Sequence, residues 1–529
     1  MRLGFLIDNR KCIGCHACTV ACKSEHDVPL GVYRTWVKYV ETGQFPNNRR
    51  HFTVLRCNHC DDAPCIPSCP VTALYRRHQD GIVDFDPERC IGCKACLQAC
   101  PYDALHIDPD THTAAKCNFC AHRVEVGLEP SCQVVCPTQA IVSGDLDDPT
   151  TYISQLISRE PVQVRKPEKG TVPKLFYIDA DESTLTPSAA TPAQDYGIWN
   201  EMPSASSSST ANGNGVAHGN GAATLHDSEN LLQDLVAKSA KTVYDVEHPS
   251  PWGWKVSAYI WTKSIAAGAF LLPAAGLTLG LVADNPLLAW GGPILALIFL
   301  AITAGLLVWD LQRPDRFFTI LIRPQWRSWI ALGTFILLFF GVVAGLSVLA
   351  ALLGAGGVVQ VLWWPGGILA ILAAIYTGFL FAQSKARDLW LSPALPVHLL
   401  VQAALAGAAA LAILGIAVET TEQTQEFLRT VLLWSLIANL FIILVGELWL
   451  PHGTRDAAKA VQMIVRGQYA QRFWIGVVGL GHVVPVVLLI AISVGLAPIA
   501  AIVAGGFALI GLLLFEDIWV RAGQALPLS

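Results

Sequence analysis

The sixteen cysteines of this 529-residue chain constrain its fold most strongly, because all of them fall between Cys12 and Cys136. They form four sets of four, and three of the sets are followed directly by proline. The sets are Cys12, Cys15, Cys18 and Cys22; Cys57, Cys60, Cys65 and Cys69; Cys90, Cys93, Cys96 and Cys100; and Cys117, Cys120, Cys132 and Cys136. A disulfide framework would not repeat its internal spacing in this way, so the pattern indicates metal ligation.

The spacing within the sets favours iron–sulfur clusters. The first and third sets follow Cys-x2-Cys-x2-Cys-x3-Cys without deviation, whereas the second and fourth carry longer gaps before Cys65 and Cys132. Three close thiolates can wrap one cubane, and in two-cluster ferredoxins the last cysteine of each run ligates the other cluster. Zinc is the alternative, but zinc sites rarely end in Cys-x3-Cys-Pro. We therefore expect four [4Fe-4S] clusters, with strand-like runs at 81–85 and 104–107 packed over them.

The order of the four sets, the long insert in the last and the closing segment 170–178 resemble a known family. They are similar to the iron–sulfur subunit of molybdopterin oxidoreductases that act through quinones, over about residues 1–180. The resemblance implies an α+β, ferredoxin-like domain in which set one pairs with set four and set two with set three, the latter pair nearer the membrane. The implied ligand groups are Cys12, Cys15, Cys18 with Cys136; Cys117, Cys120, Cys132 with Cys22; Cys57, Cys60, Cys65 with Cys100; and Cys90, Cys93, Cys96 with Cys69.

Basic residues flank the cysteine sets. They offer positive charge that could raise the reduction potentials of the clusters, or they form a solvated or subunit-facing surface. These residues are Lys11, Lys23, Arg56, Lys94 and Lys116.

Composition divides the chain into a polar half and an apolar half. Residues 1–250 hold every cysteine, whereas residues 256–520 are mostly apolar, and the net charge of −5 gives no indication of nucleic-acid binding. Residues 181–250 are rich in Ser, Thr, Ala, Asn and Gly, which predicts a low-complexity linker between two joined ancestral subunits. Within it, residues 229–244 regain an apolar pattern typical of an interfacial helix.

The apolar half, residues 251–529, predicts an all-α membrane bundle with eight spans. The predicted spans are 256–282, 288–309, 328–353, 361–383, 396–418, 428–450, 473–495 and 497–519. Loops at one end of the spans carry Arg313, Arg316, Arg323, Arg327, Lys385, Arg387, Arg455, Lys459, Arg466, Arg472 and Arg521. The opposite loops carry only Arg429, so the positive-inside rule predicts that the cluster domain faces the cytoplasm from the inner membrane. Export as a folded complex on a partner's twin-arginine signal is the alternative.

Several segments of this half resemble the eight-span, quinone-reactive subunit of polysulfide reductase, in the NrfD/PsrC-like family. They are Val308–Phe317, Ser328–Gly333, Tyr376–Leu380 with Trp390, and Gly467–Trp474. The resemblance implies a quinone pocket near the cluster-bearing face, no haem, and a role in proton movement.

Ionisable and hydroxyl side chains inside spans are the candidate site residues, because hydrocarbon makes them costly. For binding menaquinone or ubiquinone we expect Tyr376, Asp310 and His398, with Lys263 as a weaker candidate. Glu447 and His482 either form a proton relay or pair with neighbouring helices. Two axial histidines for a haem, such as His398 with His482, lack a matching pattern, and Glu516 and Asp517 are explained by an interfacial position.

No motif for nicotinamide or pterin binding is visible in the sequence, so we expect a separate molybdopterin-type catalytic subunit. The predicted function is electron transfer between membrane quinone and that subunit, in a direction that the sequence does not fix. The alternatives are a proton-coupling module of a larger respiratory complex and a membrane anchor that binds no quinone. Membrane lipid is the remaining expected partner.

Overall fold

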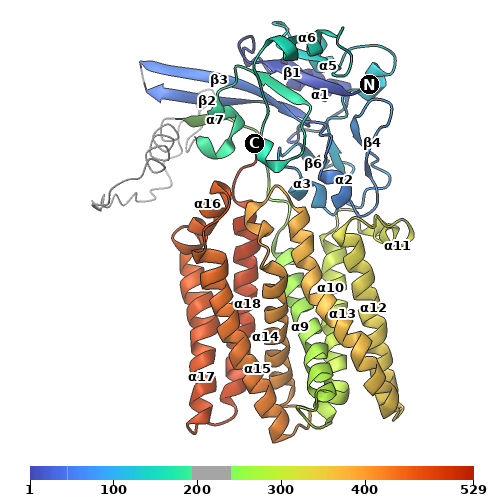
Figure 1. Cartoon of the computed structure of the whole chain (residues 1–529), viewed down its shortest axis with the longest axis vertical. Helices are drawn as coiled ribbons and strands as arrows, with labels where there is room; N and C mark the ends of the chain where they lie inside the picture. Colours follow the sequence, from blue (N-terminus) through green and yellow to red (C-terminus); the bar gives the residue numbers. More distant parts are fainter. Residues whose placement is uncertain (45, 193–239) are drawn as a thin grey trace.

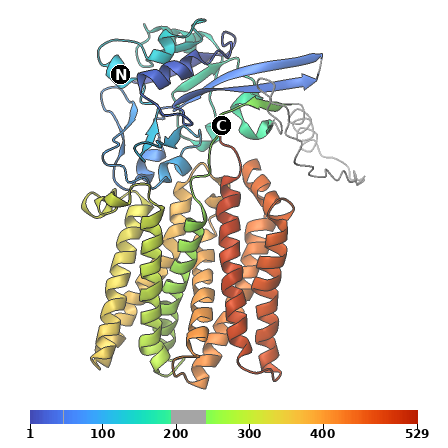
Figure 2. The same ribbon diagram turned by 180° about the vertical axis from the view of Figure 1, so that it is seen from behind.

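The computed structural model describes residues 1–44, 46–192 and 240–529. A mixed α/β domain lies on one end of a bundle of long helices, and the C-terminal segment ends between these two parts (Figure 1). The view from behind shows the same stacking of the two parts (Figure 2). The fold is therefore an α+β domain followed by an all-α membrane bundle, as the sequence predicts.

The core of the α/β domain is a four-stranded sheet in the order β8-β1-β10-β9. Its strands are β1 (Leu3–Asp8), β8 (Ile141–Asp145), β9 (Val162–Gln163) and β10 (Leu175–Ile178). β1 pairs with β10 in parallel, with Phe5 opposite Leu175, and with β8 antiparallel. All six residues of β1 are buried, which suits its mostly apolar sequence, Leu-Gly-Phe-Leu-Ile-Asp.

A second sheet, in the order β11-β12-β2-β3, forms the arm that projects sideways in Figure 1. Its strands are β2 (Thr35–Gln44), β3 (Asn47–Arg56), β11 (Thr191–Pro192) and β12 (Lys241–Tyr244). The end of the predicted interfacial helix is thus wrong: residues 241–244 form a strand between β11 and β2, because Thr, Val and Tyr favour extended strands and this segment pairs with the edge that β2 leaves open. The rest of that predicted helix, and most of the predicted linker, lie outside the described residues.

Two small hairpins and several short helices carry the cysteine sets. The hairpin strands are β4 (Leu74–Arg76) with β5 (Val83–Phe85), and β6 (Leu105–Ile107) with β7 (Ala114–Lys116). β5 and β6 confirm the strands predicted from the runs at 81–85 and 104–107. The helices are α1 (Ala17–Glu25), α2 (Cys65–Ser68), α3 (Ala95–Ala99), α4 (Ala121–Val124), α5 (Ser131–Val134), α6 (Tyr152–Arg159) and α7 (Glu182–Leu185).

The second half has eight helices long and apolar enough to span a membrane among the described residues, as predicted. They are α9 (Trp254–Thr278), α10 (Gly292–Asp310), α12 (Trp329–Leu352), α13 (Gly356–Gln383), α14 (Leu395–Leu414), α15 (Glu422–Phe441), α17 (Val484–Ser493) and α18 (Ala500–Gln524). Three are extended by the π-helical segments η3 (Leu287–Gly291), η6 (Ile442–Trp449) and η7 (Arg472–Val483). Short helices at the cluster-domain end are α11 (Thr319–Ile322), η5 (Asp388–Leu391) and α16 (Arg455–Val465).

Helix α9 lies at the centre of the bundle, and the membrane-spanning part of this helix is the most buried of the eight. It packs against α14 at a point where two glycines meet, Gly268 and Gly407. A Cβ atom on Gly268 would lie 1.9 Å from the carbonyl oxygen of Ala403, so only glycine allows this approach. Small residues bring helix backbones together in this way in membranes, where burial in lipid supplies little drive for association.

Candidate metal centres and membrane cavity

The fold gathers the cysteines into groups that each mix two sets. One small cavity is lined by Cys12, Cys15, Cys18 and Cys136, and another by Cys69, Cys90, Cys93 and Cys96. Each cavity thus takes three thiols from one run and one from a run far away in sequence. This crossed arrangement is the one that iron–sulfur clusters adopt in two-cluster ferredoxins.

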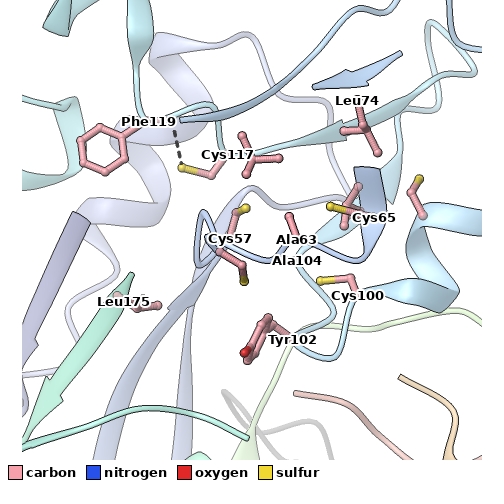
Figure 3. Packing of buried hydrophobic residues seen from close by; sticks show 14 of the residues in the cluster. Cys57, Ala63, Cys65, Leu74, Cys100, Tyr102, Ala104, Cys117, Phe119 and Leu175 are labelled. Carbon is pink, nitrogen blue, oxygen red and sulfur yellow. Dashed lines mark hydrogen bonds between the residues drawn. The ribbon is translucent and has the colours of Figure 1, made fainter. Parts of the chain in front are cut away.

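The remaining eight thiols form two further groups by proximity. Cys57, Cys65 and Cys100 converge around Ala63 and Ala104 (Figure 3). The thiols of Cys57 and Cys100 also lie close enough to Cys60 to interact with it electrostatically. Burial, with the added repulsion of neighbouring thiols, raises the pKa of Cys22 and Cys100 to about 11. The last group is Cys22, Cys117, Cys120 and Cys132.

The surroundings of these sulfurs fit thiolate ligands of a metal cluster. All sixteen cysteines are free of disulfide bonds. Backbone N–H groups donate to the Sγ atoms of Cys69 (from Ala73, 3.2 Å), Cys90 (from Ala114, 3.3 Å) and Cys136 (from Ala140, 3.2 Å). Hydrogen bonds of this kind stabilise a thiolate, and four thiolates buried together require the positive charge of metal ions.

Contacts between groups arrange the four in a line. We number them from Cys15: the first holds Cys15, the second Cys132, the third Cys57 and the fourth Cys93. Cys18 of the first group interacts electrostatically with Cys132 of the second, Cys117 of the second with Cys57 of the third, and Cys65 of the third with Cys96 of the fourth. Cys15, in the first group, is exposed at the surface of the domain. The line therefore runs from an exposed end at Cys15 to an end at the membrane half.

The fourth group lies directly against the membrane half. The backbone N–H groups of Gln312 and Arg313 donate to the carbonyl oxygens of Gly92 and Ile91, each at 3.2 Å. Gly92 has φ +69°, and a Cβ atom there would lie 2.5 Å from the Cβ atom of Gln312, so glycine is required for this contact.

Helix α3, which lies between Cys93 and Cys100, is held by polar side chains of the membrane half. The Nε2 atom of Gln98 donates to Oε1 of Gln524 at 2.6 Å, and Nε of Arg387 donates to Oε1 of Gln98 at 2.8 Å. These buried bonds fix the position of the fourth cysteine group above the helices.

A cavity of about 580 Å³ extends from this group into the bundle. Its walls are mainly apolar side chains of α9, α10, α11, α12 and α13. The exceptions include Cys93, Tyr259, Asp310 and Tyr376. Of the residues expected to bind quinone, Asp310 and Tyr376 line this cavity. Tyr259 also lines it and was not predicted, although its hydroxyl in an apolar span was the available signal.

Side chains around the cavity hold its polar residues in place. The ammonium of Lys94, next to Cys93, forms an ion pair with Asp310 at 2.9 Å. Lys263 lies behind the wall: its Nζ donates to the Ala374 carbonyl and the Thr377 hydroxyl, and lies 5.0 Å from the centre of the Tyr376 ring. Lys263 thus supports Tyr376 but does not line the cavity.

The glycine of the Ser328–Gly333 motif makes room for the tyrosine. A Cβ atom on Gly333 would lie 2.3 Å from Cε2 of Tyr376. Two of the segments that resemble the quinone-reactive family therefore meet at one wall of the cavity, although 43 positions separate their key residues in sequence.

The structure does not bring His398 to this cavity, contrary to our expectation. His398 belongs to a separate buried chain, in which Asn439 bridges the Nε2 atoms of His398 (2.9 Å) and His482 (2.8 Å). Glu447 lies 3.7 Å from the Nδ1 atom of His398. His398 misses the cavity because α14 is rotated so that this side chain faces α15 and α18. The predicted ends of a span do not reveal such a rotation. Asn439, a polar residue in an apolar span, was a signal that we did not use.

Comparison with known proteins finds a matching family model for each half of the chain. The family model described as "Polysulphide reductase, NrfD" matches residues 242–527, which is more than half of the chain. This chain belongs to the NrfD family. A model for a 4Fe-4S dicluster domain matches residues 49–146 of the N-terminal half, so this NrfD protein also carries iron–sulfur clusters.

Relatives of the N-terminal half are single subunits. The B component of tetrathionate reductase from Salmonella typhimurium is 44% identical over 208 residues, which cover 38% of this chain and 81% of that protein. The B component of polysulfide reductase from Wolinella succinogenes is 40% identical over 180 residues, 34% of this chain and 94% of that protein. Protein NrfC of Escherichia coli is 43% identical over 180 residues, which cover 34% of this chain and 81% of that protein. This NrfD-family chain therefore joins an iron–sulfur, electron-transfer subunit to the membrane subunit of an oxidoreductase complex.

Proposed function

We propose that the chain passes electrons between a membrane quinone, menaquinone or ubiquinone, and a separate molybdopterin catalytic subunit. The observation that carries this proposal is the cavity of about 580 Å³, because a cluster-ligand cysteine, Cys93, shares its walls with Asp310 and Tyr376. A mainly apolar cavity with a few polar groups suits a quinone ring and the first part of its isoprenoid tail.

Each polar residue near the cavity has a distinct role in the proposal. The Tyr376 hydroxyl is the donor to one quinone carbonyl, and the Asp310 carboxylate exchanges the proton that accompanies each electron. Lys94 holds Asp310 at the rim through their ion pair. Lys263 positions the Tyr376 ring and does not bind the quinone itself.

The four cysteine groups provide the route for electrons. We propose that each group holds one [4Fe-4S] cluster, with the ligand groups described above. When bound, such clusters accept and release single electrons at potentials set by charge, hydrogen bonds and exposure. The exposed Cys15 end is where we place the catalytic subunit, because the side chains of Ile13, Val20 and Val134 are more than half exposed beside it.

We also propose that protons reach the membrane interior through the chain of Glu447, His398, Asn439 and His482. Asn439 is hydrogen-bonded to both histidines, and Glu447 lies 3.7 Å from His398. This buried row of polar side chains is the specific observation that favours the second candidate function, a proton-coupling module of a larger respiratory complex. His482 lies in the π-helical segment η7 and Glu447 in η6, and such segments are frequent at functional sites.

The orientation proposed is a cluster domain on the cytoplasmic side. Arg313 and Arg316, in a basic loop of the membrane half, contact carbonyl oxygens of the cluster domain, so this loop and the clusters lie on one side. The positive-inside rule then favours the cytoplasm. Protease access to residues 193–239 in inverted and right-side-out vesicles tests this directly.

The test of the quinone site is quinol-dependent reduction of the clusters in membrane vesicles, followed by absorbance bleaching. Tyr376→Phe and Asp310→Asn are expected to lower the rate by about 100-fold, because each removes a proton donor or acceptor. Tyr469→Phe and Asp315→Asn are matched controls that do not line the cavity, and they are expected to keep the wild-type rate.

Two outcomes would contradict the proposal. If both cavity variants keep the wild-type rate, the cavity is not the site at which quinol reacts. If the chain purifies with a catalytic subunit that contains neither molybdenum nor tungsten by metal analysis, the molybdopterin partner is wrong.

A further inference from the structure

Arg56 is a fully buried cation between the two cysteine groups farthest from the membrane. It ends strand β3, its side chain has 0% exposure, and its guanidinium stacks 4.4 Å from the centre of the Phe5 ring. Its Nη1 atom donates to the Sγ atom of Cys132 at 3.0 Å. It also interacts electrostatically with Cys117 of the same group and Cys18 of the next. The single positive charge of Arg56 therefore acts on cysteines of both groups.

The remaining donors of Arg56 have no protein partner. Its Nε and Nη2 atoms are buried and form no hydrogen bond within the part of the chain that the structure describes. No carboxylate lies in ion-pair range in that same part. A buried guanidinium with unpaired donors costs several kcal/mol unless another anion satisfies it. The anions available are the thiolates and the sulfides of the clusters they would hold.

Two other buried cations near the cysteine groups have protein partners for their ammonium groups. Lys116, next to Cys117, donates to the carbonyl oxygens of Val83 and Cys117. Lys94, next to Cys93, is paired with Asp310. Arg56 differs from both lysines, because the one hydrogen bond that its side chain forms within the described residues goes to a cysteine sulfur.

We propose that Arg56 is a positioning residue that raises the reduction potentials of the two clusters on the exposed side. A fixed positive charge stabilises a cluster more when it has gained an electron, and hydrogen bonds to its sulfurs act in the same direction. The effect is to make the partner-side pair a better electron acceptor than it would be without this charge. The inference rests on the four cysteine groups of the proposed function, and not on the quinone site.

The test is a redox titration of the full, cluster-loaded chain, monitored by electron paramagnetic resonance. Arg56→Met is expected to lower two of the four midpoint potentials and leave the other two unchanged, whereas Arg56→Lys keeps all four close to wild type. Arg165→Met is the matched control, since Arg165 is equally buried but donates to the carbonyl oxygens of Leu185 and Leu528. Arg165→Met is expected to leave all four midpoint potentials unchanged.

Unchanged midpoints in Arg56→Met, or an equal shift of all four, would overturn the proposal. If Arg56→Met does not retain its iron, Arg56→Gln replaces it, because glutamine keeps a donor without the charge. The proposal then stands if Gln lowers two midpoints and Lys does not. It fails if both neutral variants lose iron while Lys holds it, since Arg56 would then be structural. Midpoints are independent of the quinol assay, so each proposal can fail alone.

Discussion

The same seven-residue pattern, Cys-Ile-Gly-Cys-x-Ala-Cys, occurs at both ends of the line of cysteine groups, at 12–18 and at 90–96. The two copies have the same local shape: Gly14 and Gly92 have φ near +70°, and His16 and Lys94 near +60°. Their surroundings differ. His16 lies among the rings of Tyr39 and Tyr244, whereas Lys94 pairs with Asp310 of the membrane half.

This comparison separates what the pattern dictates from what the position dictates. The shared pattern places three cysteine sulfurs on one short turn of the chain. The residue that differs between the copies is His16 in one and Lys94 in the other. This residue and the surface it contacts decide whether the turn faces a partner or the membrane. The membrane-side copy should therefore be less tolerant of change than the exposed copy.

The largest difference is expected for the two ligand cysteines, Cys93 and Cys15. Cys93→Ser should abolish quinol-dependent reduction of every cluster, because electrons enter the line beside it. Cys15→Ser should leave the other three groups reducible and block only transfer to the partner. Absorbance bleaching with quinol, together with iron content per chain, distinguishes them. Equal losses in both variants would mean that electrons do not enter at Cys93.

The next difference concerns the variable residue. Lys94→Met leaves Asp310 largely buried without its cation, which should lower the free energy of unfolding by about 3 kcal/mol. The double variant Lys94→Met with Asp310→Asn should recover much of that stability. His16→Met removes no ion pair and should cost less than either single change at the membrane side. Thermal unfolding of the cluster domain, measured by loss of cluster absorbance, compares these variants. A double variant less stable than Lys94→Met would rule out the pairing.

A smaller effect is expected at the glycines. Alanine at either position costs about 1–3 kcal/mol because φ is positive. Gly92→Ala also meets the Cβ and backbone nitrogen of Gln312, whereas Gly14→Ala meets only the Phe52 ring, which can turn aside. Quinol-dependent reduction should therefore fall in Gly92→Ala and stay near wild type in Gly14→Ala. The reverse order would show that the junction does not need the close approach at Gly92.

The last prediction is a pH dependence that arises at the junction of the two halves. Burial, together with the nearby positive charge of Arg165, lowers the pKa of Lys166 from its usual 10.5 to about 7. Folding then expels a proton between about pH 7 and pH 10.5, so stability should rise with pH across that window and level off below it. Lys166→Met should flatten the slope of the melting temperature against pH. An unchanged slope in Lys166→Met would mean that another titratable group causes the pH dependence.

The sequence alone was sufficient to predict an iron–sulfur domain, the order of the two halves and the eight spans. Ligand spacing and span length are local properties, so they do not depend on how distant segments meet. It also led to Tyr376 and Asp310, which the structure places on one cavity and whose role in quinone binding stays a prediction. It failed at residues 241–244, where a free sheet edge outweighed an apolar pattern that suggested a helix.

The tertiary structure alone decided which of the polar residues in the spans meet. Tyr376, Asp310 and Cys93 come from three distant segments and converge on one cavity. His398 lies at a similar depth but turns to Asn439 and Glu447. Sequence gives the depth of a residue in a span, because depth follows from counting along one helix. The direction in which its side chain points depends on how that helix is rotated against its neighbours, and that is settled only by packing.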